Sequence, residues 1–159
     1  MKHVITALVE NQPGVLARIV GLISGRGFNI ESLNVAPTQD STVSRLTMTV
    51  PGDDHVLEQV TKQLNKLVDV IKVSDLTQKR YLSRELMLVE VNCPSAKRAE
   101  ALALADLFDA RVVSVQPKSL TVQIADSEAR LDDFIEAVKS VGILDISRSG
   151  AIAVARGGD

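Results

Sequence analysis

The apolar residues in the first half of the chain switch repeatedly between the spacing of a strand and the spacing of one helix face. Strands are predicted at 4–9, 28–37, 43–50 and 68–73, and the third alternates apolar and polar side chains like a half-buried strand. Two helical stripes separate them, one after the first strand and one after the third. Their apolar residues are Val15, Leu16, Ile19, Val20, Leu22 and Ile23, and then Val56, Leu57, Val60 and Leu64. The predicted order is βαββαβ, ending near Leu76.

The second half repeats this order with little similarity in sequence. Strands are predicted at 85–92, 110–115, 120–124 and 144–154, the last interrupted by Gly150, and helices are predicted at 96–108 and 131–141. Residues 78–84 have no apolar period, so we interpret them as a linker. The pattern therefore predicts an α+β protein with one domain at 1–77 and a second at 85–159.

The connection between the first strand and the first helix is the stretch best suited to a ligand. Asn11, Pro13 and Gly14 precede the helix, and proline suits a first helical position because it leaves no N–H unpaired there. The free N–H groups and partial positive charge of a helix N-terminus attract a carboxylate or a phosphate, and glycine lets a ligand approach them closely. The matching stretch of the second half, 92–95, has the proline but no glycine. A simple turn into a core helix explains the same residues, so the pattern alone leaves both interpretations open.

Composition narrows the class of function. Aromatic residues make up 3% of the chain, there is no tryptophan, and the net charge is −2, which together argue against a nucleic-acid partner. The single cysteine, Cys93, excludes an internal disulfide and fits a reducing compartment. No apolar stretch is long enough to span a membrane and no signal-peptide pattern is present, so we expect a cytoplasmic protein with no membrane partner.

No group of residues forms a recognisable catalytic or metal-binding motif. His3 and His55 are far apart in the sequence, and we expect both at the surface. Cys93 has no CxxC partner, so we expect an unreactive small residue. The acid pairs 53–54 and 132–133 begin predicted helices, where capping explains them better than acid–base catalysis. We therefore expect no catalytic residue, metal or cofactor in this chain.

Residues 10–33 resemble the ACT domain family, and other segments make the resemblance narrower. The matching runs are Glu10-Asn11-x-Pro13-Gly14-Val15-Leu16-x-Arg18-Ile19-x-Gly21-Leu22, Arg26-Gly27-Phe28-Asn29-Ile30-Glu31-Ser32-Leu33, Arg84-Glu85-Leu86-Met87-Leu88-Val89 and Arg148-Ser149-Gly150. Together they are similar to the regulatory small subunits of acetolactate synthase over nearly the whole chain. The match is weakest at 92–131.

The resemblance implies two ferredoxin-like βαββαβ domains, of which the N-terminal one is an ACT domain. It implies a non-catalytic regulatory subunit in branched-chain amino acid biosynthesis. Such a subunit forms a homodimer through its ACT domains, binds and activates a large catalytic subunit, and confers feedback inhibition by a branched-chain amino acid, typically valine. Thiamine diphosphate, Mg²⁺ and FAD would belong to the catalytic partner.

Carried over by position, the effector site takes its residues from two protomers. Asn11, Gly14, Val15 and Leu16 would come from one protomer, and Asn29 and Ile30 from its neighbour. Backbone N–H groups at 14–16 suit the α-carboxylate, the two asparagine amides suit the carboxylate or the ammonium group, and Leu16 with Ile30 suits an aliphatic side chain.

Three alternative functions remain open. A stand-alone ACT amino-acid sensor that regulates another enzyme is the nearest. A small enzyme on a ferredoxin-like fold, such as a phosphatase, would need a phosphate-holding arginine and a positioned histidine or asparagine in one loop. An RNA binder of similar topology is disfavoured by the few aromatic residues and the negative net charge.

Overall fold

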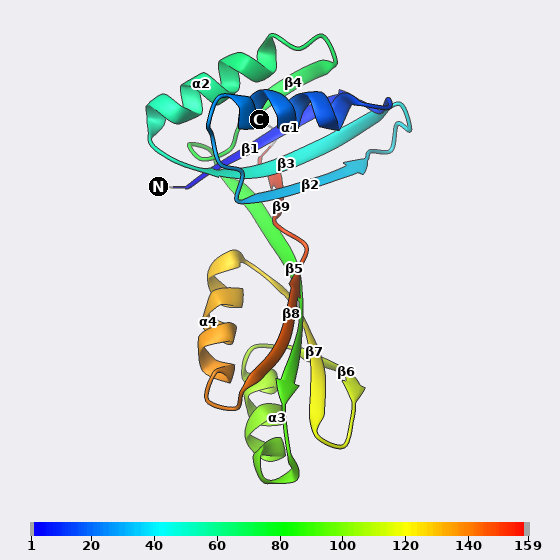
Figure 1. The fold of residues 1–159 in the computed structure, drawn as a ribbon, viewed down its shortest axis with the longest axis vertical. Coiled ribbons are helices and arrows are strands. Elements are labelled where there is room, and N and C mark those ends of the chain that lie inside the picture. Colours follow the sequence, from blue (N-terminus) through cyan, green and yellow to red (C-terminus); the bar gives the residue numbers. More distant parts are fainter. Residues whose placement is uncertain (1, 158–159) are drawn as a thin grey trace. The chain divides into compact units, whose positions relative to one another are not determined.

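Both predicted βαββαβ units are present in the computed structural model, which describes residues 2–157 (Figure 1). The first compact unit consists of residues up to 82 together with the C-terminal segment from 151, and the second consists of residues 83–150. The α+β fold class predicted from the sequence is confirmed.

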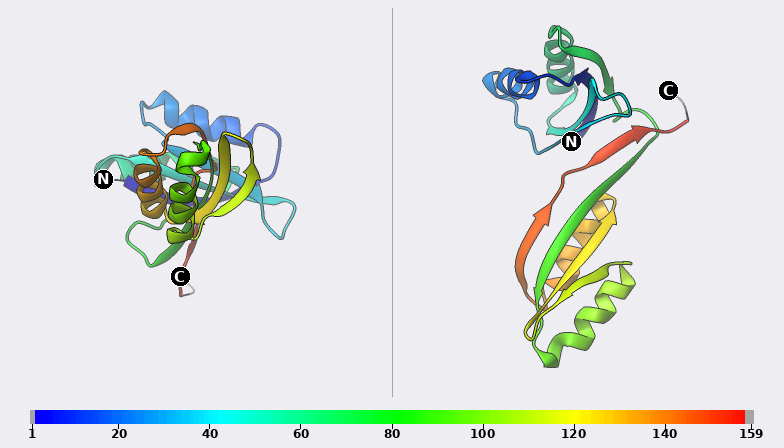
Figure 2. Two further views of the ribbon diagram at one scale, coloured as in Figure 1. Left: turned by 90° about the horizontal axis from the view of Figure 1, so that it is seen from below. Right: turned by 90° about the vertical axis from the view of Figure 1, so that its right-hand side faces the viewer.

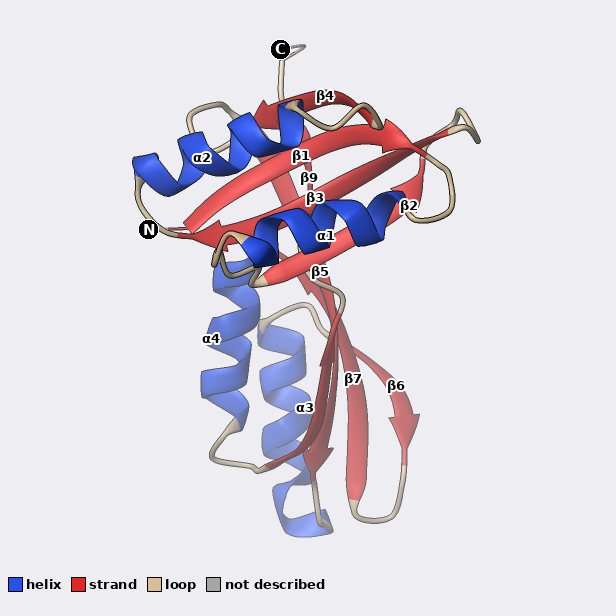
Figure 3. Cartoon of the chain, turned by 45° about the horizontal axis from the view of Figure 1, so that its top comes forward, coloured by secondary structure: helices blue, strands red, loops and turns tan. Residues whose placement is uncertain are grey.

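The first unit is a four-stranded sheet with the strand order β2-β3-β1-β4 and a layer of two helices. Its elements are β1 (Lys2–Glu10), α1 (Val15–Gly25), β2 (Ser32–Pro37), β3 (Val43–Pro51), α2 (Asp54–Asn65) and β4 (Val70–Asp75). All strand pairs in this sheet are antiparallel, and β2 and β4 form its two edges. Helices α1 and α2 lie on the same face of the sheet (Figure 3).

Strand alternation explains where the core of the first unit lies. On β1, Ile5, Ala7 and Val9 face the helices and are at most 3% exposed, while the intervening residues face the opposite side. Ile19 and Leu64 pack against them from α1 and α2, and both are fully buried. Helix α1 ends at Gly25, and Gly27 then adopts the left-handed conformation with φ 78°, which favours the end of a helix.

His3 is a correction to the sequence analysis, which placed it at the surface. Its position on β1 has the same parity as Ile5, so the imidazole points toward the helices and is 0% exposed. Neither ring nitrogen has a hydrogen-bond partner among the described residues. His55 is exposed in the first turn of α2, as predicted.

The second unit repeats the same strand order as β6-β7-β5-β8, with both helices on one face of its sheet (Figure 2). Its elements are β5 (Tyr81–Asn92), a short 3₁₀ turn (Ser95–Lys97), α3 (Arg98–Leu107), β6 (Arg111–Val115), β7 (Ser119–Asp126), α4 (Glu128–Val138) and β8 (Ile143–Arg148). Phe108 and Phe134 meet edge to face in its core, with ring centroids 5.3 Å apart. Cys93 is buried as a free thiol in the same core.

Arg148 at the end of β8 forms ion pairs with Glu85 on β5 and with Asp132 on α4. Arg148 Nε donates to Glu85 Oε1 at 2.6 Å, and Arg148 Nη1 donates to Asp132 Oδ1 at 3.0 Å. The hydrogen bond to Glu85 is the largest cause of a raised pKa of the Arg148 guanidinium. Because Glu85 is only 7% exposed, the arginine supplies the positive charge that this buried carboxylate needs.

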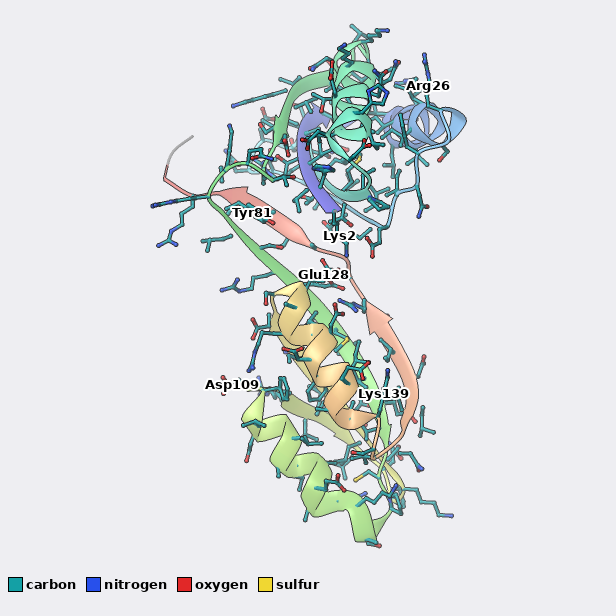
Figure 4. The ribbon with its side chains drawn as sticks, turned by 90° about the vertical axis from the view of Figure 1, so that its left-hand side faces the viewer. Lys2, Arg26, Tyr81, Asp109, Glu128 and Lys139 are labelled. Carbon is teal, nitrogen blue, oxygen red and sulfur yellow. The ribbon has the colours of Figure 1, made fainter. Side chains whose placement is uncertain are left out.

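Two features of the chain differ from the predicted boundaries. The segment 78–84, expected to be a linker, already contains the first residues of β5. The predicted last strand divides into β8 and a separate β9 (Ile152–Ala155), which belongs to the first unit rather than to the second. Strand β9 pairs with β5, and Ala153 packs with Val4, Leu76 and Tyr81, the last of which is labelled in Figure 4.

Candidate functional site

The N-terminus of α1 has an open backbone because of Gly14. This residue caps the helix in the left-handed conformation, with φ 83° and ψ −9°, which L residues with a side chain rarely adopt. A Cβ added to Gly14 would also lie 3.1 Å from Arg18 Nη1. Glycine therefore provides both the turn and the free space above the first helical turn.

Three N–H groups at this helix start have no hydrogen-bond partner within the described part of the chain. They belong to Gly14, Leu16 and Ala17. The N–H of Val15 differs, because it donates to the Gln12 carbonyl at 3.3 Å. The predicted carboxylate donors at 14–16 thus include one that is already used, and Ala17 adds one that the sequence analysis missed. Unpaired N–H groups at a helix N-terminus form a site for an anion.

Asn11 fixes the loop that leads into this helix. Its backbone N–H donates to the Thr42 carbonyl at 2.8 Å, and its Nδ2 donates to the Ser41 carbonyl at 2.9 Å. These bonds attach the β1–α1 loop to the β2–β3 hairpin, and they leave the Asn11 Oδ1 acceptor available. The hairpin turn is itself held by Asp40, whose carboxylate accepts from the Thr42 hydroxyl and N–H, and these bonds lower the pKa of Asp40.

A small pocket of about 60 Å³ opens beside the helix start. Its lining residues come from β1, the β1–α1 loop, α1, β2 and β3: Val9, Glu10, Asn11, Gln12, Val15, Leu16, Ile19, Val35, Ser44 and Leu46. Leu16 is 42% exposed and Val35 is 36% exposed, so two aliphatic side chains face solvent at its rim. The pocket combines a polar loop with an apolar wall, as an amino acid with an aliphatic side chain requires.

Charge near the pocket is partly balanced by an ion pair. Arg18 Nε lies 2.8 Å from Asp69 Oδ2, and the Asp69 carbonyl accepts from the Glu10 N–H at 2.9 Å. Arg18 stays half-exposed next to the Gly14 turn. A ligand carboxylate at the helix start therefore meets a positive helix end together with a nearby guanidinium.

The structure brings together four of the six predicted site residues and separates the other two. Asn11, Gly14, Val15 and Leu16 lie at the start of α1, although the Val15 side chain is buried and contributes to the core. Asn29 and Ile30 follow the other end of this 11-residue helix, roughly 16 Å away at a rise of 1.5 Å per residue. Asn29 is exposed, and Ile30 packs partly against the core. Within a single chain these two residues cannot reach the Gly14 loop, so their part in the site stays a prediction about a second protomer.

Several lining residues were missed by the sequence analysis. Val35 and Ser44 could have been found, because the short connection between the predicted strands 28–37 and 43–50 pairs them, and alternation then decides which residues share a face. The pairing of Arg18 with Asp69 had no signal in the sequence, because it joins a helix to a loop 51 residues away.

Two further observations concern metal binding and membrane spans. Among residues 2–157, no three His, Cys, Asp or Glu side chains gather as metal ligands would. No helix in the same range is both long enough and apolar enough to cross a lipid bilayer.

Comparison with known proteins matches both halves of the chain. Residues 5–72 match the family model described as an AHAS small subunit-like ACT domain, and residues 84–157 match the model described as the small subunit of acetolactate synthase. The predicted ACT family is therefore confirmed for the N-terminal half.

Similar proteins agree over the full length. A probable acetolactate synthase small subunit from Archaeoglobus fulgidus is 47% identical over 157 residues, which is 99% of this chain and 98% of the relative. The acetolactate synthase isozyme 3 small subunit of Escherichia coli is 43% identical over 99% of this chain and 97% of its own length. A crystal structure of the acetolactate synthase small subunit from Thermotoga maritima superposes with a TM-score of 0.90 at 30% identity, covering 100% of this chain and 99% of that one. The chain belongs to the family of acetolactate synthase small subunits, with an ACT domain as its N-terminal half.

Proposed function

We propose that this chain is the regulatory subunit of an acetolactate synthase and that it transmits feedback inhibition by valine to a large catalytic subunit. The observation that carries the proposal is the start of α1, where three unpaired N–H groups lie beside a pocket with an exposed aliphatic rim. In this proposal the valine α-carboxylate accepts from Gly14, Leu16 and Ala17, and the isopropyl group contacts Leu16 and Val35. The ammonium group is received by the free Oδ1 of Asn11, which lines the same pocket.

The second half of the site is proposed to come from a neighbouring protomer. Strand β2 is an edge of its sheet, paired only with β3, so its outer N–H and C=O groups are available to a second copy of the chain. Val35, which lines the pocket, lies on this edge strand. Asn29 and Ile30 of the second protomer would then complete the site in a homodimer of ACT domains.

A ligand shared by two protomers changes the dimer only through its different affinity for two arrangements. Typical coupling between such sites is about 1–3 kcal/mol, or roughly 5- to 150-fold in affinity. Valine would favour the arrangement that the catalytic subunit reads as inhibitory, and the same subunit without valine would raise the activity of its partner. The catalytic subunit would carry thiamine diphosphate, Mg²⁺ and FAD, and we place the assembly in the cytoplasm.

The test is reconstitution with the catalytic subunit and an assay of acetolactate formation with and without valine. Gly14→Asp adds a carboxylate where the ligand carboxylate would lie, so the reconstituted enzyme should stay activated but lose inhibition by valine. Gly21→Asp is the matched control, because Gly21 lies on the exposed face of α1 with open space around it. This control should keep normal inhibition.

Either of two results would overturn the assignment of the site. One is normal valine inhibition of the Gly14→Asp complex, and the other is equal loss in Gly14→Asp and Gly21→Asp. A chain that binds valine but neither binds nor activates the catalytic subunit would instead be an amino-acid sensor for another enzyme.

A further inference from the structure

A second pocket, of about 160 Å³, lies on the face of the first unit's sheet that is turned away from α1 and α2. Its lining comes from β1, β3, β4, β9 and the turn after β4: Thr6, Leu8, Arg45, Lys72, Ser74, Leu76, Lys79, Val154 and Ala155. None of these residues lines the pocket beside Gly14. The function proposed above leaves this pocket unused.

Strand register explains why positive charges gather there. Leu8 on β1 pairs with Arg45 on β3 and with Lys72 on β4, so all three side chains point to one face in one row. Two strand spacings of ~4.8 Å put the Cα atoms of Arg45 and Lys72 roughly 10 Å apart, within reach of one small ligand above Leu8. Lys79 extends from the turn after β4 and adds a third cation.

The next row of the sheet supplies hydroxyl groups. Thr6 pairs with Ser74 on β4, one step along the strands from the row that contains the cations. The Thr6 side chain is only 3% exposed and lines the pocket, yet its hydroxyl has no hydrogen-bond partner among the described residues. The hydroxyl is therefore free to donate to a ligand in the pocket.

The cations are also without acidic partners. Within residues 2–157, no ion pair involves the side chains of Arg45, Lys72 or Lys79. The lining contains no carboxylate. Three like charges around one cavity repel each other, so an anion bound between them would be stabilised.

We propose that this pocket binds a phosphate group, either as inorganic phosphate or as the phosphate of a small organic molecule. A phosphate ester carries about −1.5 to −2 charge at pH 7 and three acceptor oxygens, which matches three cations with two hydroxyls better than a planar carboxylate does. Val154 and Ala155 of β9 form an apolar side of the cavity, which suits the carbon part of a small organic phosphate. The proposal is independent of the valine site.

The experiment is a titration of the full chain, in phosphate-free buffer at constant ionic strength, with inorganic phosphate and separately with ribose 5-phosphate. Heat of binding gives affinity and stoichiometry, and backbone amide NMR shifts locate the site. We expect saturable binding of one equivalent per chain, with shifts at Thr6, Ser74 and Lys79 and none at Ala17. Tighter binding of ribose 5-phosphate identifies an organic phosphate as the ligand, and equal affinities identify the free ion.

Variants test whether the named residues hold the ion. Lys72→Gln and Lys79→Gln should each weaken binding about tenfold, since each removes a charge-assisted hydrogen bond. Thr6→Val keeps the shape of the side chain and should also weaken binding. Lys66→Gln removes an exposed charge at the end of α2, outside the pocket, and should change nothing. Valine inhibition of the reconstituted enzyme should persist in all four variants, which separates failure of this site from failure of the proposed function.

Four results would overturn the proposal. They are absence of saturable binding, shifts confined to the start of α1, equal weakening by Lys66→Gln, and variants that weaken only association with the catalytic subunit. The last result would mean that the cations contact an acidic surface of a partner protein.

Discussion

At the scale of single residues, the buried imidazole of His3 has a stability consequence. It occupies a core position on β1 with both ring nitrogens unpartnered among the described residues, and burying a polar group in that way costs about 1–3 kcal/mol. His3→Leu has similar volume and no polar atom, so it should raise the free energy of unfolding by roughly 1 kcal/mol or more. Urea unfolding followed by circular dichroism measures the change.

The matched control is His55→Leu, because His55 is exposed in the first turn of α2. It should leave the unfolding free energy within about 0.5 kcal/mol of the parent. A loss of stability in His3→Leu would show that the imidazole makes a favourable interaction that an apolar side chain cannot replace.

Single residues were also where prediction from the sequence was most uneven. Asn11 and Gly14 were predictable, because a polar residue, proline and glycine before an apolar helix stripe indicate both the helix start and its open backbone. The burial of His3 was equally determined by strand alternation, but its place near the chain start led us to expect exposure. Arg45, Lys72 and Lys79 were not predictable as a cluster, since only the pairing of three strands brings them to one row.

At the scale of elements, the cap of α2 makes stability depend on pH. Asp53 accepts from the Val56 N–H at 3.0 Å, and this bond is the largest cause of the lowered pKa of its carboxyl. A carboxyl whose pKa is lower in the folded state contributes stability above its unfolded value, and that contribution disappears as the pH falls through the folded value. Asp53→Ala should therefore lower the thermal unfolding midpoint at pH 7, and the difference from the parent should shrink as the pH falls below about 4.

Asp54→Ala is the control for this cap, because Asp54 lies in the first turn of the same helix and makes only a dipole interaction. Its effect at pH 7 should be smaller than that of Asp53→Ala. A gap between parent and Asp53→Ala that stays constant from pH 7 to pH 2 would mean that the carboxylate charge plays no part in the cap.

The helices and the internal strands could be predicted from periodicity, but the start of β5 and the separate strand β9 could not. The start of β5 was interpreted as a linker because its residues show no alternation of apolar and polar side chains. In the structure Leu82 and Arg84 are both exposed. Strand β9 continues the apolar run of β8 in sequence, and only its packing with Val4, Leu76 and Tyr81 shows that it belongs to the first unit. Local pattern identifies strands well, but it does not identify the compact unit against which a strand packs.

At the scale of the whole molecule, the stability of the first unit depends on the last residues of the chain. Removing residues 151–159 uncovers Val4 and Leu76, which are 8% and 2% exposed, together with part of Tyr81. The lost apolar burial should cost the first unit about 1–3 kcal/mol. Amide hydrogen exchange should therefore speed up in β1 and β4 and stay unchanged in β7.

A chain that lacks only residues 157–159 keeps β9 and serves as the control, since its exchange rates should match those of the parent. Unchanged protection of β1 and β4 after removal of 151–159 would show that β9 adds nothing to the first unit.

The return of β9 to the first unit also makes the second unit an insertion, because residues 83–150 interrupt a unit that begins before them and ends after them. The two ends of that insertion are held together, with the Ser149 N–H donating to the Leu86 carbonyl at 3.0 Å. During synthesis, which adds roughly 5–20 residues per second, the second unit has all its helices and β5 to β8 about 0.4–1.4 s before β9 is complete. The unit begun first on the ribosome is therefore the one completed last, because the segment that covers Val4 and Leu76 is made after the inserted unit.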